Sequence, residues 1–257
     1  MLNFICTEFF ADAMTGSRPD NIRDAYQTIR DQEPWTHPDS TISHHRILPF
    51  STLAPWLDDK EFIEIYEKVK LNTLVDIYRC YELWYLAKQL TNVQGSILEV
   101  GVWRGGTGAI LTKAAQANGK KVFLADTFEG VVKAGSKDTS YKGGEHADTS
   151  EAMVKHLMES LLLPNYSILT GIFPDETSHL VEVPIAMLHC DVDVYSSAKD
   201  VVEWCLPHLS VGGVMVFDDY GFLGCEGVTV FCQELQKRQD LVFIHNINGH
   251  AIYIKIA

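Results

Sequence analysis

Two stretches decide the fold, His189-Cys-Asp-Val-Asp-Val-Tyr195 and, about twenty residues later, Val216-Phe-Asp-Asp-Tyr220. Each follows an apolar run, Ile185–Leu188 in the first case and Val214–Phe217 in the second, and each run ends abruptly in acidic residues. Short apolar runs of this kind are typical of strands that are buried on both faces of a parallel sheet. The pattern predicts two such strands.

The segment between the two runs has the features of a crossover helix. Ser196 and Ser197 are candidate caps for its start, Pro207 would close it, and Gly212-Gly213 would turn the chain into the second run. A strand, a helix and a second parallel strand form a βαβ unit. In open α/β sheets, ligands bind outside the carboxyl ends of the strands.

Four acids therefore fall where a ligand is expected: Asp191, Asp193, Asp218 and Asp219. Four carboxylates on two neighbouring strand ends repel one another unless a positive charge lies between them. Oxygen ligands favour a hard cation, with Mg²⁺ first and Mn²⁺ or Ca²⁺ as alternatives. We do not include His189, because a histidine inside a strand is more often a hydrogen-bonded core residue.

A glycine-rich turn precedes these stretches. The strand Ser96–Val100 leads into Gly101-Val-Trp-Arg-Gly-Gly-Thr-Gly108, which opens into a helix. Glycines let the backbone approach a ligand closely, although the spacing is not G-x-G-x-x-G. Asp126 ends the next strand, where an acid can accept hydrogen bonds from ribose hydroxyls. Together with Glu99, these residues predict a nucleoside site without a pyrophosphate cradle.

The rest of the chain completes an α/β fold. Residues 1–94 are expected to form a helical cap or extension, and residues 95–257 a domain with seven strands that closes with an antiparallel hairpin. This arrangement is typical of class I methyltransferases, which have a Rossmann-like, mostly parallel sheet. The long segment from Glu129 to Ser150 is expected to be a lid, with His146 a possible substrate contact. Further predicted helices, strands and connectors cover residues 20–30, 34–49 (with His37, His44 and His45), 56–90, 109–117, 121–125, 150–163, 166–170, 226–237, 241–246 and 251–256.

Composition narrows the class of partner. The formal net charge of −13 disfavours nucleic acid and fits the binding of cations. No apolar run reaches the length of a membrane span, so we expect a cytoplasmic protein with reduced cysteines and no membrane partner. We also expect a homo-oligomer that acts on a small molecule.

Taken together, these motifs resemble the macrocin O-methyltransferase family (TylF type), which methylates sugar hydroxyls of antibiotics with S-adenosylmethionine. The resemblance covers residues 95–257 and is carried by residues 99–106, 126–130, 171–173, 191–197 and 212–220.

The resemblance implies a role for each matching residue. Asp191, Asp218 and Asp219 would hold Mg²⁺, and Asp193 would be the general base. The cofactor site would comprise Glu99, Gly101, Arg104 and Thr107 around the methionine part, Asp126 at the ribose, and Gly171 and Phe173 near the adenine. The acceptor would be a sugar nucleotide or a glycosylated natural product of antibiotic biosynthesis.

Three other functions remain open on the sequence. A Mg²⁺-dependent O-methyltransferase of catechol-like acceptors would use the metal in the same way. A catalytically silent module that binds S-adenosylmethionine would not need all four acids. A nicotinamide-dependent oxidoreductase is disfavoured by the missing dinucleotide fingerprint.

Overall fold

The computed structural model describes residues 53–257. The chain divides into two compact units, Met1–Pro55 and Trp56–Ala257, and the second contains the whole sheet and the helices packed on it. The helix predicted at residues 20–30 and the connector at 34–49, with its three histidines, lie outside the described residues.

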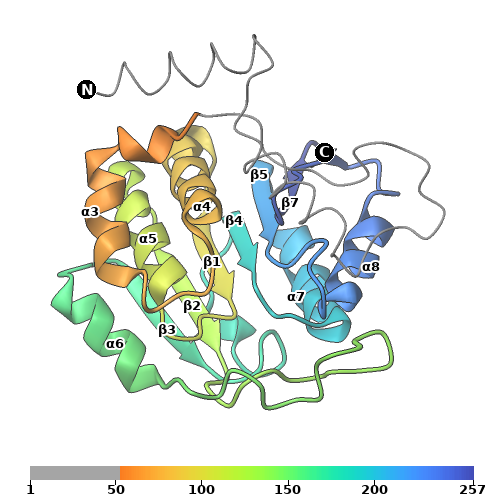
Figure 1. The fold of residues 1–257 in the computed structure, drawn as a ribbon. Coiled ribbons are helices and arrows are strands. Elements are labelled where there is room, and N and C mark those ends of the chain that lie inside the picture. The colour runs from red at the N-terminus through yellow and green to blue at the C-terminus, as the bar shows by residue number, and fades with distance from the viewer. Residues whose placement is uncertain (1–52) are drawn as a thin grey trace, which may run out of the picture. The chain divides into compact units, whose positions relative to one another are not determined.

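A seven-stranded sheet forms the centre of the second unit (Figure 1). Its strands lie in the order β3-β2-β1-β4-β5-β7-β6. The first five are parallel, whereas β7 runs antiparallel to both β5 and β6. The strands are β1 (Ser96–Val100), β2 (Val122–Asp126), β3 (Tyr166–Thr170), β4 (Ile185–Cys190), β5 (Leu209–Phe217), β6 (Leu241–Ile244) and β7 (Ala251–Lys255). The predicted fold class and closing hairpin are confirmed.

Helices cover both faces of this sheet. On one face lie α3 (Lys60–Val69), α4 (Ile77–Gln89), α5 (Gly106–Ala115) and α6 (Glu151–Ser160), and on the other lie α7 (Tyr195–His208) and α8 (Glu226–Leu235). Successive residues of a strand point to opposite faces. In β1, Ile97 accordingly packs in the first core and Leu98 in the second, and both are fully buried.

The sheet unit begins earlier than the sequence boundary at Gly95. The contacts place its start at Trp56, because α3 and α4 bury their apolar faces in the same core as α5. Phe62, Leu83 and Trp84 are fully buried there. Each helix starts at an aspartate cap, Asp59 for α3 and Asp76 for α4, as an amphipathic surface helix commonly does.

The crossover helix α7 starts differently from the expectation. It is capped by neither Ser196 nor Ser197: its cap position is Val194, which offers no side-chain acceptor. Asp138 Oδ1, from a distant part of the chain, instead accepts from the Tyr195 amide at 2.9 Å. Gly212-Gly213 lies inside β5, and that strand therefore starts at Leu209, well before Val214.

Residues 127–150, here called the lid, cross the carboxyl ends of the parallel strands without forming a helix or strand (Figure 1). Besides Asp138, the lid is fastened by Lys133, whose ammonium group lies 2.7 Å from Asp175 and 2.6 Å from Asp200. Ser197 donates its hydroxyl to the Val132 carbonyl at 2.8 Å. The predicted lid is thus ordered against α7.

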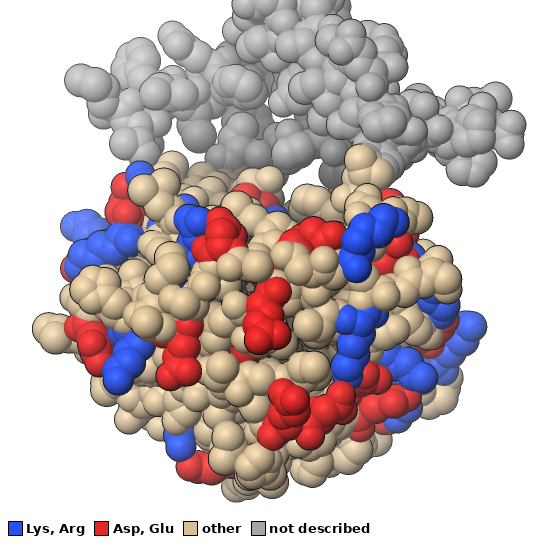
Figure 2. Space-filling model, turned by 90° about the horizontal axis from the view of Figure 1, so that it is seen from below, with Lys and Arg blue, Asp and Glu red and all other residues tan. Residues whose placement is uncertain are grey.

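Neither the surface charges nor the cysteines of the described residues indicate a different class of protein. Figure 2 shows acidic and basic side chains interspersed over the face of the described residues seen from below. Within residues 53–257, no helix has both the length and the apolar character needed to cross a membrane. The five cysteines of this part are buried and unpaired, as expected for reduced thiols.

Candidate active site

A cavity of about 290 Å³ opens at the carboxyl ends of the central strands. It is lined by residues at the ends of β1 and β2, by those that directly follow β4 and β5, and by residues of the lid and of the segment before α4. All the site residues predicted from the sequence line it except Glu99 and Arg104. Those that do are Gly101, Thr107, Asp126, Gly171, Phe173, Asp191, Asp193, Asp218 and Asp219.

One end of the cavity, here called the acid end, holds three carboxylates that approach one another closely. Asp191, Asp218 and Asp219 each offer an oxygen, and these oxygens lie within 4.8 Å of one another. Burial, reinforced by the charges of Asp218 and Asp219, raises the pKa of Asp191 well above its ordinary value. Burial and the charges of Asp218 and Asp193 do the same to the pKa of Asp219. A cation placed among them would remove this cost.

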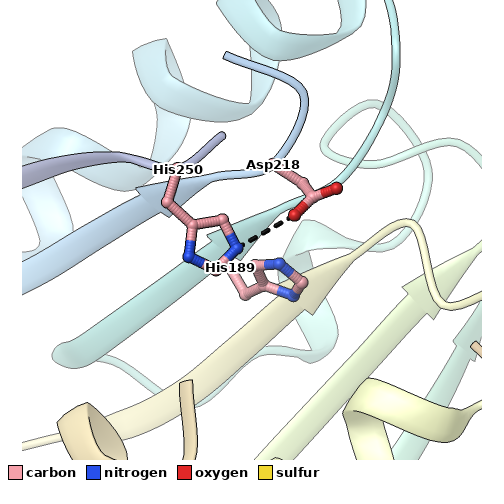
Figure 3. A group of neighbouring side chains, drawn as sticks. All are labelled: His189, Asp218 and His250. Carbon is pink, nitrogen blue, oxygen red and sulfur yellow. Dashed lines mark hydrogen bonds and ion pairs between the residues drawn. The ribbon is translucent and has the colours of Figure 1, made fainter. Parts of the chain in front are cut away.

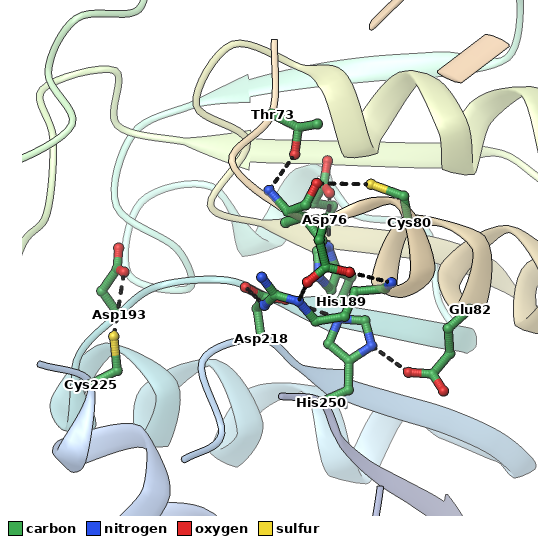
Figure 4. A network of polar contacts seen from close by, with 12 residues as sticks. Thr73, Asp76, Cys80, Glu82, His189, Asp193, Asp218, Cys225 and His250 are labelled. Carbon is green, nitrogen blue, oxygen red and sulfur yellow. Dashed lines mark hydrogen bonds and ion pairs between the residues drawn. The ribbon is translucent and has the colours of Figure 1, made fainter. Parts of the chain in front are cut away.

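Asp218 differs from its neighbours because protein cations already hold it (Figure 4). Arg79 Nη1 donates to its Oδ2 at 2.6 Å, and His250 Nε2 lies 2.9 Å from its Oδ1. Burial alone would raise the pKa of Asp218, but the hydrogen bond from His250 and the charge of Arg79 outweigh it and lower the pKa. Asp218 is therefore the carboxylate that remains ionised most easily.

The partners of Asp218 are themselves held by acids. Arg79 Nε donates to Asp76 Oδ2 at 2.7 Å, and His250 Nδ1 lies 2.5 Å from Glu82 Oε2. Two carboxylate partners require a proton on each ring nitrogen of His250. Burial would lower the pKa of His250, but these two hydrogen bonds raise it. The result is a largely buried chain of alternating charges from α4 to His250, directly before β7.

His189 lies beside this chain and behaves as a core residue, as predicted. It is fully buried, and its Nδ1 lies 2.9 Å from Glu99 Oε1. Figure 3 shows its ring next to His250 and Asp218. His250 and Asp218 are bonded to each other, whereas His189 Nε2 has no hydrogen-bond partner among the described residues.

Asp193 faces the cavity from the turn between β4 and α7. Its backbone is in the left-handed region, with a φ of 63°, which aspartate tolerates better than most residues. The side chain does not cap α7, whose cap position has no side-chain bond. Instead its Oδ1 accepts a hydrogen bond of 2.6 Å from the lid residue Tyr141, whose hydroxyl also lies 3.4 Å from His146 Nε2.

The glycine turn after β1 forms the other end of the cavity, here called the turn end. Gly101 has a φ of 90°, and a Cβ there would lie 1.6 Å from the Asp191 carbonyl oxygen. Only glycine fits this approach. Thr107 is buried in the first turn of α5, and Gly106 donates its amide to the Asn72 carbonyl at 2.9 Å.

Asp126 holds the turn end together through backbone groups. Its Oδ2 accepts from the amides of Val102 and Trp103 at 2.7 and 2.8 Å, and its Oδ1 accepts from Phe128 at 2.7 Å. A carboxylate can accept about four hydrogen bonds, so one acceptor position remains for a ligand hydroxyl. Gly171 and Phe173 line the cavity next to it, and the Gly171 amide donates to the Asp126 carbonyl at 2.9 Å.

Glu99 and Arg104 lie outside the cavity lining. Glu99 is fully buried beneath the turn, between His189 and Gly108, and one of its oxygens has no hydrogen-bond partner among the described residues. Arg104 stacks on Trp103 and forms an ion pair with Asp148 of the lid. Glu99 thus packs beneath the glycine turn, and Arg104 fastens the lid to that turn.

Sequence reasoning missed Arg79, Glu82, Tyr141 and His250. A signal was available for Arg79, which lies four residues before Leu83 and eight before Ala87, on the face of α4 that is fully buried. A charge at such a position needs a buried partner. Tyr141 and His250 carry no comparable signal, because a lone tyrosine in a loop and a lone histidine beside a strand are compatible with many structural roles.

The residues present fit both groups that the resemblance implies. For a divalent cation, Asp191 and Asp219 offer carboxylates that form no ion pair within residues 53–257, and Asp219 Oδ2 is buried there without a hydrogen-bond partner. Hard cations prefer such oxygens. For a nucleoside cofactor, the free acceptor position of Asp126 and the glycine turn lie in the same cavity.

The fold defines the class of protein. The sheet order, with an antiparallel final hairpin, is that of class I methyltransferases. The structure of the O-methyltransferase NovP superposes with a TM-score of 0.59 at 23% identity, over 72% of this chain and 83% of that one. The calicheamicin methyltransferase CalS11 also gives 0.59, at 16% identity, over 80% and 95% of the two chains.

The chain belongs to the macrocin O-methyltransferase (TylF) family, whose model matches residues 73–255. It is 29% identical over 168 residues to the 8-demethyl-8-(2,3-dimethoxy-alpha-L-rhamnosyl)-tetracenomycin-C 4'-O-methyltransferase of Streptomyces olivaceus, covering 60% of this chain and 64% of that protein. It is 31% identical over 147 residues to the mycinamicin III 3''-O-methyltransferase of Micromonospora griseorubida, covering 52% and 58%. The matched part thus spans less than two thirds of these relatives.

Proposed function

We propose that this protein is an S-adenosylmethionine-dependent, Mg²⁺-dependent O-methyltransferase that acts on a sugar hydroxyl of a small glycosylated molecule. The observation that carries the proposal is the single cavity that joins the turn end to the acid end. Membership of the family supports the reaction, and the names of the relatives support a sugar acceptor.

Each end of the cavity would have its own task. Asp126, Gly171 and Phe173 would bind the nucleoside part of the cofactor, and Gly101 and Thr107 its amino-acid part. Asp191, Asp218 and Asp219 would hold the cation. When bound, S-adenosylmethionine supplies an electrophilic methyl group and Mg²⁺ a Lewis acid that orients the acceptor and lowers the pKa of its hydroxyl.

The remaining steps belong to the side chains of this chain. Asp193 would accept the proton of the acceptor hydroxyl as general base. The lid would cover the cavity and exclude water. Arg79 and His250 would keep Asp218 ionised and fixed in position, so that the carboxylates do not rearrange when the acceptor enters. Alignment of the hydroxyl with the methyl group would supply much of the rate.

The experiment is transfer of an isotope-labelled methyl group from S-adenosylmethionine to a panel of acceptors. The panel contains mycinamicin III and demethyldecarbamoylnovobiocin, which the names of two relatives give as substrates, together with a sugar nucleotide and catechol. Methylation of a glycoside or of the sugar nucleotide is expected. Transfer to catechol alone would replace the acceptor class, and a purified protein that does not bind S-adenosylhomocysteine in calorimetry would refute the reaction.

A companion experiment tests the metal. EDTA should abolish turnover and Mg²⁺ restore it. Asp191→Asn should lower kcat by about 10²–10⁴-fold, because several kcal/mol of charge stabilisation are lost. Its affinity for S-adenosylhomocysteine should stay close to wild type. Asp58→Asn, an exposed acid outside the cavity, is the matched control. Full activity in metal-free buffer would assign the acids another task.

The homo-oligomer and the cytoplasmic location stay predictions. Size-exclusion chromatography with light scattering measures the first.

A further inference from the structure

Among the described residues, Tyr141 of the lid makes the shortest hydrogen bond to the side chain of Asp193. The phenol donates to Asp193 Oδ1 at 2.6 Å, whereas the next donor, Cys225 Sγ, lies 4.0 Å from the same oxygen. A thiol at that distance is a weak donor. Tyr141 is half-buried and lines the cavity. Tyr141 is therefore the closest hydrogen-bond donor to this carboxylate, which the side chain of Asp219 also approaches.

The local backbone does not provide that orientation. Asp193 is in the left-handed region and precedes a helix that it does not cap. A residue other than glycine is strained in this region, aspartate less than most, and it persists there only where its surroundings fix it. Tyr141, which lies fifty-two residues away along the chain, is part of those surroundings.

We propose that Tyr141 is a positioning residue for Asp193. It holds Oδ1, so that Oδ2 is the oxygen that receives the proton of the acceptor hydroxyl. This inference rests on the proposed function, in which Asp193 is the general base. Burial and the charge of Asp193 raise the pKa of Tyr141, so the phenol stays protonated and acts as the donor. The lid is then part of the catalytic apparatus as well as a cover.

The lid has other anchors, which makes the role of this hydroxyl separable. Asp138 accepts from Tyr195, and Thr139 donates its hydroxyl to Glu226 Oε2 at 2.6 Å on the exposed side of the lid. Thr139→Val removes a lid hydrogen bond of the same kind two residues away, outside the cavity lining. It is the matched control for Tyr141→Phe, which also removes a single hydroxyl.

The test is a double-mutant cycle on kcat and KM, with the member of the acceptor panel that wild type methylates. Tyr141→Phe should lower kcat by about 10–100-fold, as expected for a misplaced catalytic group, with little change in acceptor KM. In an Asp193→Ala background the same change should have almost no effect, because the residue it positions is gone. Thr139→Val should stay close to wild type.

Three results would overturn the proposal. One is an equal loss of kcat from Tyr141→Phe with and without Asp193. Another is an equal loss from Thr139→Val, which would reduce Tyr141 to a lid anchor. A wild type that does not bind S-adenosylhomocysteine would defeat the proposed function and this role with it. In that case a double-mutant cycle on the free energy of unfolding in urea shows whether Tyr141 and Asp193 interact. Coupling in that cycle would make their hydrogen bond a structural contact only.

Discussion

The turn end of the cavity is bounded mainly by backbone groups, whereas the acid end is bounded by charged side chains from separate parts of the chain. At the turn end, the Asp126 carboxylate accepts hydrogen bonds from three backbone amides that lie within twenty-four residues of it. At the acid end, Arg79 reaches Asp218 across 139 residues. The first arrangement follows once β1 and β2 have formed side by side. The second exists only when the whole unit has folded.

This difference separates two ways of building a site. A turn held by amides tolerates changes in the surrounding side chains, because each residue other than proline offers the same backbone group. A buried chain of charges tolerates very little. Removing one member leaves its neighbour as an uncompensated charge, and that penalty exceeds the strength of the bond that was lost. The two ends should therefore respond very differently to single substitutions.

The largest effect is expected for Arg79→Met at the acid end. It removes the guanidinium that Asp218 and Asp76 share and leaves Asp218 with His250 alone, so the free energy of unfolding should fall by about 3–5 kcal/mol in urea titrations. The control is Arg238→Met, which breaks an exposed pair with Asp240 and should cost about 0–1 kcal/mol. Equal losses in the two variants would show that the buried chain of charges stabilises the fold no more than a surface pair does.

A smaller effect is expected for Asp126→Asn at the turn end. An amide cannot accept from all three backbone donors, so the free energy of unfolding should fall by about 1–3 kcal/mol. Affinity for S-adenosylhomocysteine should weaken by about 10–100-fold in calorimetry, since a charged acceptor is lost. Glu129→Gln, a nearby exposed acid, is the control. Unchanged affinity would leave Asp126 as a clamp of the turn alone.

The smallest effect is expected for Arg104→Gln. Its partner Asp148 is exposed, and its guanidinium points to the lid rather than into the cavity lining. Both the melting temperature and the affinity for S-adenosylhomocysteine should stay close to wild type. A clear loss of affinity in calorimetry would return Arg104 to the cofactor site, where the family resemblance had put it, and would weaken the contrast between the two ends.

The sequence predicted the turn end and the acids because their signals are local. A strand that ends in acid, or in glycines, shows both the element and its carboxyl end, and the sheet then brings those ends together. The partners of the acids are not local. His250 reaches Asp218 from the other side of a hairpin, and Tyr141 reaches Asp193 from a segment with no periodicity.

Helix α7 shows the same limit on a smaller scale. Ser196 and Ser197 are good caps by residue type, yet the amide of Tyr195 is satisfied by Asp138. A tertiary contact replaced a local preference, and the helix starts one residue earlier than Ser196. The boundary at Gly95 stays a prediction, although α3 and α4, which carry the aromatic pattern of a separate cap, share the core of the sheet.

The chain of charges from α4 to His250 also determines which pieces of this protein could be moved into another. A truncated chain that began at Gly95 would keep all four acids but lose Arg79 and Glu82, the groups that balance Asp218 and His250. A chimera that exchanged the final hairpin would lose His250 in the same way. A chimera should therefore keep an arginine, an aspartate and a histidine at the positions of Arg79, Asp218 and His250, whichever parent supplies them.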